Sequence, residues 1–395
     1  MPELSEITNN IEQTFKTKFN SSPDMFYSPG RINLIGEHTD YNNGLVLPAA
    51  IDKYIFLAIA SREDDEIHIF SQDYQDSYAT SLSAIQISNK LWPDYILGVI
   101  DQIQKLDKKL RGVNIVFGGN IPQGAGLSSS AAVECATAYA FNSLFNLGFN
   151  SLELAKISQK AENEFVGVKC GLMDQFASVF GKENKFIKLD CGSYEHQYIP
   201  FDTDQYSLIL FDTQVKHSLA SSAYNERRQQ CEYGVQLIQK HYPEITSLRQ
   251  ATQAMLDEFI KPFDAITYKR CQYIIQEIKR VEDACNDLLE SDFRQFGKRM
   301  FQTHEGLKNE YEVSCKELDF LVDFVKDYPE VLGARMMGGG FGGCTINLIE
   351  NKAIDNISNS TAIAYEKAMG KAMKIYPISI VDGTKLLKDA RNESK

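Results

Sequence analysis

The stretch that most constrains the fold is residues 28–44, which read SPGRINLIGEHTDYNNG. Ile32 and Leu34 alternate with polar neighbours, which is the period of a half-buried strand. Pro-Gly before this run and Asn-Gly after it are strong turn signals. The sequence therefore predicts a strand, then a polar loop that carries two carboxylates and an imidazole towards the next strand.

This polar loop can act in one of two ways. Glu37 and Asp40 can accept hydrogen bonds from neighbouring hydroxyls of a polyol, and a rigid pair separates sugars because the wrong one leaves a charge unpaired. Exposed Asp and Asn are also among the commonest turn residues, so a loop that contacts only water fits the same residues. The residues alone leave both interpretations open.

Length and composition describe an ordinary soluble globular protein. With 395 residues the chain exceeds what one core usually supports, and its 43% hydrophobic content can fill two domains. A net charge of -12 argues against a nucleic-acid partner, because that affinity depends on clustered Lys and Arg. The net charge does not exclude an anionic small-molecule ligand whose charges are neutralised by basic groups close to it.

Cysteines and apolar runs indicate the compartment. The eight cysteines contain no C-x-x-C pair, so neither a zinc framework nor a small disulfide scaffold is indicated. The N-terminus lacks an apolar signal-peptide core, and the apolar stretch 45–60 is interrupted by Pro48, Asp52 and Lys53. We therefore expect a cytoplasmic protein, kept reduced and without membrane contact.

Periodicity along the chain separates strands from helices. Strand patterns occupy residues 26–27, 32–35, 45–47, 54–60, 66–70, 113–117 and 207–211, with a strand and turn across 186–200. Helical spacing occupies 7–19, 91–106, 128–147, 154–165 and most of 223–324. Helices gathered after strands indicate an α+β fold with a mixed sheet, and a composition shift near 195–205 divides it into domains 1–198 and 199–395.

A glycine-rich bend at residues 118–132, GGNIPQGAGLSSSAA, precedes the first long helix. Such a bend brings backbone N–H groups close to phosphate oxygens, and the helix N-terminus adds its dipole. It is not a Walker A loop, because no Gly-Lys-Ser/Thr follows. The hydroxyls of Ser128, Ser129 and Ser130 either cap the helix or bind Mg²⁺ and phosphate, and the residues do not decide between these roles.

A second glycine cluster, GGGFGG at residues 338–343, formally matches the dinucleotide-binding pattern G-x-G-x-x-G. That pattern must open a helix, whereas residues 344–349 have a strand-like composition. The dinucleotide interpretation is therefore rejected. A protein-kinase interpretation also fails, because the chain contains neither His-Arg-Asp nor Asp-Phe-Gly.

Two further carboxylates are candidates for chemistry. Glu162 comes late in the predicted helix 154–165, and Asp174 lies in the segment CGLMDQ at 170–175. A magnesium ligand and a catalytic carboxylate would suit these places. The alternatives are a solvated helix face for Glu162 and a helix N-cap for Asp174.

The chain resembles the galactokinases, a branch of the GHMP small-molecule kinases, through GRINLIGEHTDY, the GLSSS loop, CGLMDQ and GGGFGG. The order and spacing agree over nearly the whole chain. The first motif is the specific one, because other GHMP kinases share the glycine loops and lack GEHTDY. The resemblance implies two domains with the active site in the cleft between them: a mixed-sheet N-terminal domain like domain 2 of ribosomal protein S5, and an α+β C-terminal domain.

The same resemblance implies Mg²⁺-assisted phosphorylation of α-D-galactose by ATP at the anomeric hydroxyl, giving galactose 1-phosphate for the Leloir pathway. We expect a monomer whose partners are these small molecules. By the family pattern the catalytic residues are Asp174 and Arg31, and Ser130 and Glu162 hold the magnesium. The sugar-binding residues are Glu37, His38, Thr39, Asp40, Gly171 and Tyr224, the last within residues 217–224. The nucleotide phosphates lie on Gly124, Ala125, Gly126, Leu127, Ser128, Ser129 and Ser130.

Asp174 would be a feeble base, because the Arg31 guanidinium keeps it ionised and acceptor-only. The transition state of phosphoryl transfer is loose, so the proton can leave late. We therefore expect Asp174 mainly to orient the attacking hydroxyl.

Two alternatives stay open beside this reading. One is a related kinase for N-acetylgalactosamine or L-arabinose, whose first motif is similar. The other is a non-catalytic sugar sensor, which should show damage in the phosphate loop or at the base. In this sequence both are intact.

Overall fold

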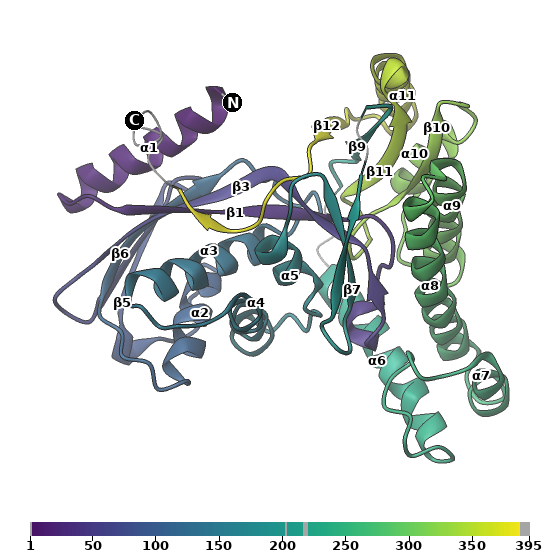
Figure 1. The fold of residues 1–395 in the computed structure, drawn as a ribbon, viewed down its shortest axis with the longest axis horizontal. Coiled ribbons are helices and arrows are strands. Elements are labelled where there is room, and N and C mark those ends of the chain that lie inside the picture. The colour runs from purple at the N-terminus through teal and green to yellow at the C-terminus, as the bar shows by residue number, and fades with distance from the viewer. Residues whose placement is uncertain (1, 202–203, 216–219, 388–395) are drawn as a thin grey trace.

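The computed structural model describes residues 2–201, 204–215 and 220–387 (Figure 1). The N-terminal half is built on a six-stranded sheet in the order β13-β1-β3-β6-β4-β5. Strands β4 and β6 run parallel and the other neighbours run antiparallel, which confirms the predicted mixed sheet. The strands are β1 (Asp24–Asn33), β3 (Pro48–Ser61), β4 (Glu66–Ser71), β5 (Asp76–Ser81), β6 (Val113–Gly119) and β13 (Lys385–Leu386).

Helices cover both faces of this sheet (Figure 1). On one face α1 (Pro2–Phe19) buries Ile11 and Phe15 against Phe56 and Val116 of the strands. The other face is covered by α2 (Asp94–Gln104), α3 (Ser129–Leu144), α4 (Ser151–Lys160) and α5 (Met173–Phe180). The buried face of α3 is rich in alanine, so this helix lies close to the strands and fixes the loop that precedes it.

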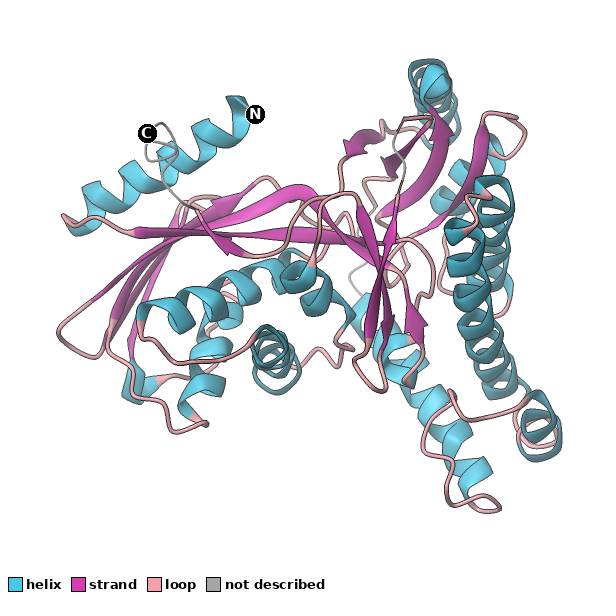
Figure 2. Cartoon of the chain, viewed as in Figure 1, coloured by secondary structure: helices cyan, strands magenta, loops and turns pink. Residues whose placement is uncertain are grey.

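The second half carries an antiparallel sheet in the order β10-β11-β9-β12, flanked by helices (Figure 2). Its strands are β9 (Tyr206–Asp212), β10 (Val331–Met336), β11 (Cys344–Glu350) and β12 (Lys374–Ile378). The helices are α6 (Ala220–Gln239), α7 (Gln253–Phe259), α8 (Ala265–Leu289), α9 (Phe293–Asn309), α10 (Lys316–Val325) and α11 (Ile354–Met369). The α+β class predicted from the sequence is confirmed.

Smaller elements complete the fold. A three-stranded sheet joins β2 (Leu45–Val46), β7 (Lys185–Asp190) and β8 (His196–Pro200). Short 3-10 turns are η1 (Asp40–Asn42), η2 (Leu82–Ala84) and η4 (Asn351–Ala353), and η3 (Ala161–Val166) is a π-helical turn. Over the described ranges, no helix is long and apolar enough to cross a membrane.

Two local predictions differ from the structure, and strand β5 has no counterpart among the predictions. The patterns at 26–27 and 32–35 belong to one strand, β1, which ends at Asn33 and shifts register between Pro29 and Arg31. The predicted helix 154–165 becomes π-helical after Lys160. Strand β5 was not predicted, because its residues are polar and none is fully buried, so the alternation of apolar residues is lost.

The predicted domain boundary between 198 and 199 falls inside β8 and stays a prediction. After the second sheet the chain returns to the first, where β13 pairs with β1 at Phe26 and Tyr27. Residues 388–395, the end of the predicted second domain, lie outside the described residues.

Candidate active site

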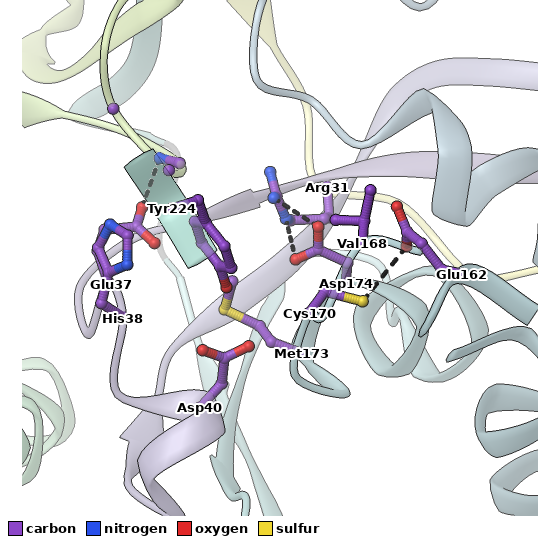
Figure 3. Close-up of a pocket in the computed structure, with 13 residues that line it drawn as sticks. Arg31, Glu37, His38, Asp40, Glu162, Val168, Cys170, Met173, Asp174 and Tyr224 are labelled. Atoms are coloured by element: carbon purple, nitrogen blue, oxygen red, sulfur yellow. Dashed lines mark hydrogen bonds and ion pairs between the residues drawn. The ribbon is translucent and has the colours of Figure 1, made fainter. Parts of the chain in front are cut away.

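A cavity of about 280 Å³ opens where the first loop, the end of β10 and the start of α5 meet (Figure 3). It draws its lining from both halves of the chain. Figure 3 shows Tyr224 of α6 between His38 on one side and the Arg31–Asp174 pair on the other. The lining residues are Arg31, Glu37, His38, Asp40, Glu162, Val168, Cys170, Met173, Asp174, Tyr224, Gly338, Gly339 and Gly340.

Arg31 and Asp174 form a bidentate ion pair at one wall. Arg31 donates from Nε to Oδ1 of Asp174 at 2.8 Å and from Nη2 to Oδ2 at 2.7 Å. Its third nitrogen, Nη1, donates to the carbonyl of Gly126 in the phosphate loop at 2.5 Å. Asp174 lies in the first turn of α5, whose N-cap is Leu172, so the N-cap alternative for Asp174 is wrong. The pair therefore connects the cavity with the phosphate loop.

Three glycine segments converge beside this pair. A Cβ at Gly30 would come within 2.7 Å of the Leu127 carbonyl, so the backbones touch there. Gly126 has a φ of +78° and Gly338 a φ of +80°, and a Cβ at Gly338 would lie 3.6 Å from the Gly126 carbonyl. Only glycine adopts such backbone without strain. The cluster 338–343 joins β10 to β11 and opens no helix, in agreement with rejecting the dinucleotide interpretation.

The serines after this loop have different surroundings. Ser128 is the N-cap of α3, but its φ is +56° and its side chain makes no cap hydrogen bond. Its hydroxyl donates instead to Asp174. Ser129 and Ser130 begin the helix and line a second cavity with Gly124. The cap alternative therefore fails for Ser128, whose hydroxyl helps to hold Asp174.

Glu37 is buried and held by three donors. Arg335 of β10 donates from Nη2 to Oε1 at 2.9 Å, and the backbone N–H of Gly338 donates to the same oxygen at 2.8 Å. Asn33 donates from Nδ2 to Oε2 at 2.9 Å. Arg335 is completely buried and also donates to the carbonyls of Asn33 and Leu34. One acceptor position of the carboxylate, on Oε2, is left for a ligand.

Asp40 lies on the floor of the cavity, pressed against a glycine. A Cβ at Gly171 would come within 2.0 Å of Oδ2 of Asp40, so glycine is required there. Burial, and next the charge of Asp174, raise the pKa of Asp40 to about 7. The backbone N–H of Tyr41 opposes this rise by hydrogen bonding to Asp40. The site thus holds a carboxyl group that gains or loses a proton near neutral pH.

Of the other residues of the first loop, some line the cavity and others support the loop. The His38 ring packs on Tyr224 with centroids 5.2 Å apart, and both line the cavity. Thr39 is buried, and its hydroxyl contacts the carbonyls of Gly36 and Leu45 rather than the cavity. Residues 217–219, which precede Tyr224 in the motif, lie outside the described residues. The Thr39 hydroxyl therefore supports the loop, and a contact of Thr39 with sugar stays a prediction.

Glu162 lies in the π-helical turn η3 and is buried, so its solvated-face alternative is wrong. It forms a hydrogen bond with Ser130 and accepts one from Nε2 of Gln175 at 2.7 Å. The same amide donates to the buried Glu134 at 3.0 Å. Burial, and next the charge of Asp174, raise the pKa of Glu162 to about 7. Two carboxylates and a serine hydroxyl are thereby gathered where the phosphate loop meets the cavity.

A second cavity, of about 360 Å³, lies on the other side of the phosphate loop. Tyr74 and Trp92 stack in its wall with their ring planes 17° apart, and Trp92 also packs on Phe117. Since Ser130 lines this cavity and bonds to Glu162 of the first, the two cavities adjoin at this contact. Aromatic faces of this kind bind planar bases.

Most of the predicted site residues come together in the structure. The loop residues Ala125 and Leu127 are buried and contribute backbone, with the Leu127 carbonyl accepting from the N–H of Arg31. Sequence reasoning missed Arg335 and the aromatic wall around Trp92. A charged residue inside an apolar strand and the only tryptophan of the chain were the available signals.

Comparison with known proteins identifies the class first. The GHMP kinases N terminal domain matches residues 94–182, and the GHMP kinases C terminal domain matches 284–367. The mevalonate kinase of Methanococcus jannaschii has the same fold, with a TM-score of 0.63 at 19% identity over 92% of this chain and 99% of that one. The fold is that of the GHMP kinases.

The particular family follows from three further matches. The galactokinase galactose-binding signature matches residues 13–61. The galactokinase of Thermotoga maritima is 43% identical over 90% of this chain and 98% of its own length, and that of Clostridium perfringens is 38% identical over 95% and 98%. The structure of Lactococcus lactis galactokinase complexed with galactose has a TM-score of 0.93 at 31% identity, covering 96% of this chain and all of that one. The chain belongs to the galactokinase family.

Proposed function

We propose that this protein phosphorylates the anomeric hydroxyl of α-D-galactose with ATP, giving galactose 1-phosphate and ADP, the first step of the Leloir pathway. The observation that carries the proposal is the Arg31–Asp174 pair, which lies between the polar cavity and the phosphate loop. A hydroxyl on Asp174 would face phosphates held by that loop. The names of the related proteins support the same reaction.

The polar cavity is assigned to the sugar. Its volume is at the low end of small-molecule pockets, which suits one monosaccharide. Glu37 offers one free acceptor position and Asp40 offers a carboxyl group without an ion pair among the described residues. His38 and Tyr224 close one side, and the backbone at Gly171 lies next to Asp40. These groups can contact several hydroxyls of one hexose.

The second cavity is assigned to the nucleotide. Its aromatic wall would stack on the adenine base, and its other end is formed by Gly124, Ser129 and Ser130 at the start of α3. The free N–H groups and the dipole of this helix N-terminus favour phosphate oxygens. The chain of phosphates would therefore lead from the aromatic wall towards the Arg31–Asp174 pair.

The residues at the junction of the two cavities fit a magnesium ion. Mg²⁺ is usually held by one or two carboxylates together with substrate phosphates. Glu162 and Ser130 supply a carboxylate and a hydroxyl in contact with each other, and one oxygen of the nearby Glu134 is buried without a partner among the residues that the structure describes. Bound there with ATP, the ion would neutralise charge on the phosphates.

The protein contributes to the reaction mostly by positioning the reacting groups. The sugar O1 attacks the γ-phosphorus, the bond from that phosphorus to the bridging oxygen of ADP breaks, and the hydroxyl proton passes late to Asp174. Asp174 is held on both oxygens by Arg31 and also accepts from Ser128, so its direction is fixed before the sugar arrives. The remaining charge of Arg31 stabilises the transferring group.

Sugar-stimulated release of ADP tests the proposed function. Galactose should stimulate ADP release strongly, EDTA should abolish it, and added Mg²⁺ should restore it. A larger stimulation by N-acetylgalactosamine or L-arabinose would assign the protein to one of those kinases. Binding of galactose and ATP without ADP release would identify a sensor.

A fluorescence experiment tests the nucleotide cavity. Trp92 is the only tryptophan of the chain and is buried in the wall of that cavity. ADP with Mg²⁺ should therefore change the tryptophan emission in a saturable way, because a stacked base alters the surroundings of the indole. Galactose alone is the control and should change it little. An emission unaffected by saturating ADP would contradict the assignment.

The affinity for galactose should rise with pH. Below pH 7 Asp40 is mostly protonated, since its pKa is raised to about 7, and a sugar hydroxyl that donates to it favours the ionised form. Binding should therefore release a proton, and the affinity should increase about tenfold from pH 6 to pH 8. Calorimetry in buffers of different ionisation heat measures both effects. In Asp40→Asn the pH dependence should vanish, and a flat wild-type profile would refute the role of Asp40.

We further propose that the protein acts as a monomer in the cytoplasm. All eight cysteines are free thiols, which is the state that a reducing compartment maintains. Sedimentation at micromolar concentration would test the monomer, and a dimer would contradict it.

A further inference from the structure

A continuous line of hydrogen-bonding side chains runs from helix α6 to the sugar cavity. It starts at Cys231, whose sulfur lies 3.3 Å from the hydroxyl of Tyr311. The hydroxyls of Tyr311 and Tyr41 are 2.8 Å apart. The hydroxyl of Tyr41 lies 2.9 Å from Nδ1 of His38. The line therefore ends on a residue that lines the sugar cavity.

Each phenol in this line has one hydrogen to donate, and a neutral imidazole has one N–H. Burial lowers the pKa of His38 to about 4 and raises the pKa of Tyr41 well above its ordinary value, so both are neutral near pH 7. Two arrangements are compatible with these protons. Either Tyr41 donates to Nδ1 and the imidazole proton is on Nε2, or Nδ1 donates to Tyr41 and Nε2 carries no proton.

Two features favour the first arrangement. A phenol is a stronger proton donor than an imidazole N–H, and the imidazole nitrogen is the stronger acceptor. In addition, the hydrogen bond from Tyr311 lowers the pKa of Tyr41, which is the effect of Tyr311 donating to the oxygen of Tyr41, so the hydrogen of Tyr41 is left for His38.

The other ring nitrogen of His38, Nε2, still requires a hydrogen-bond partner. Nε2 is buried and has no hydrogen-bond partner within the described residues. A buried N–H without an acceptor is costly, and the cavity that His38 lines is the place where an acceptor can enter. We propose that Tyr41 is a positioning residue for sugar recognition: its hydroxyl fixes the His38 tautomer with the proton on Nε2, and this N–H donates to an oxygen of the bound sugar.

This arrangement complements the two carboxylates of the site. A carboxylate only accepts hydrogen bonds, so each sugar hydroxyl that donates to Glu37 or Asp40 keeps lone pairs that need a donor. The N–H of His38 supplies one. With the opposite tautomer, the lone pair of Nε2 would face the lone pairs of a sugar oxygen. The inference rests on the proposed function for the identity of the ligand, but the tautomer itself does not depend on it.

Nitrogen NMR of the histidine rings tests the proposal directly. The chain has six histidines, and His38 is assigned by the signal lost in His38→Gln. In the wild type, Nδ1 of His38 should resonate in the unprotonated range and Nε2 in the protonated range. In Tyr41→Phe, Nδ1 loses its donor, so both tautomers should be populated. The KM for galactose should rise about tenfold, the KM for ATP should stay within twofold, and kcat should change by less than threefold.

Tyr311→Phe is the matched control, because it removes one hydroxyl from the same line and leaves the hydrogen bond from Tyr41 to His38. The His38 tautomer should be unchanged in this variant. A wild-type His38 with its proton on Nδ1 would overturn the proposal, even if Tyr41→Phe fails to fold. An unchanged tautomer and galactose KM in folded Tyr41→Phe would also overturn it. The NMR measurement needs no turnover, so it stays decisive if the protein phosphorylates another sugar.

Discussion

Asp174→Asn is expected to lower kcat about a thousandfold, while the dissociation constant for galactose changes by less than about threefold. Asparagine keeps the shape of the side chain but loses the charge that meets Arg31 at both oxygens. Its amide can also turn an N–H towards the sugar hydroxyl, which removes the acceptor for the departing proton. The loss therefore falls on the chemical step.

Rapid-quench single-turnover rates and sugar binding by calorimetry separate these two quantities for Asp174→Asn. Asp40→Asn is the matched control, because the same chemical change is made in the same cavity at a residue assigned to recognition. That variant should raise the dissociation constant for galactose more than it lowers the rate. Near-normal turnover in Asp174→Asn would rule out both the orienting and the proton-accepting role.

Glucose is expected to be phosphorylated with a kcat/KM about 10⁴-fold lower than galactose. The two sugars differ in the direction of one hydroxyl, and the cavity offers fixed acceptors. Arg335, Asn33 and Gly338 hold Glu37 in place, and Gly171 lies directly against Asp40. Neither carboxylate can follow a displaced hydroxyl, so the wrong sugar leaves a buried polar group without its partner.

Steady-state rates for galactose, glucose and the monodeoxy galactoses measure this discrimination. Asp40→Asn should reduce the ratio of kcat/KM for galactose to kcat/KM for glucose, mainly because kcat/KM for galactose falls. Glu12→Gln is a suitable control, since Glu12 lies on α1 outside the sugar cavity. Comparable kcat/KM values for galactose and glucose in the wild type would contradict recognition of the hydroxyl direction by carboxylates held in fixed positions.

The sequence alone predicted the residues of the sugar loop, but not which of them line the cavity and which support the loop. Thr39 belongs to the same motif as Glu37 and Asp40, yet its hydroxyl contacts only loop carbonyls. A side chain in a loop of mixed backbone angles has no periodicity that tells which way it points. His38, for example, has a φ of +67°, which no alternation rule anticipates.

Arg335 shows a second limit of sequence reasoning. It lies in a strand whose other residues are buried, and periodicity assigns it to the core without naming a partner. Its partner Glu37 is 298 positions away. The pairing exists because β10 and the first loop meet through the glycine cluster, and only the packed chain brings them within 2.9 Å. A buried cation without such a partner would be strongly destabilising.

The sequence by itself determined the local features of this protein: the alternating strand residues, the glycine bend before an alanine-rich helix, and the motifs that resemble galactokinases. These features depend on residues that are close along the chain, so the periodicity of the sequence predicts them well. The tertiary structure alone decided the contacts between distant segments, such as Arg31 with Asp174, 143 positions apart. Such contacts follow from how whole elements pack, and composition and spacing carry no record of that geometry.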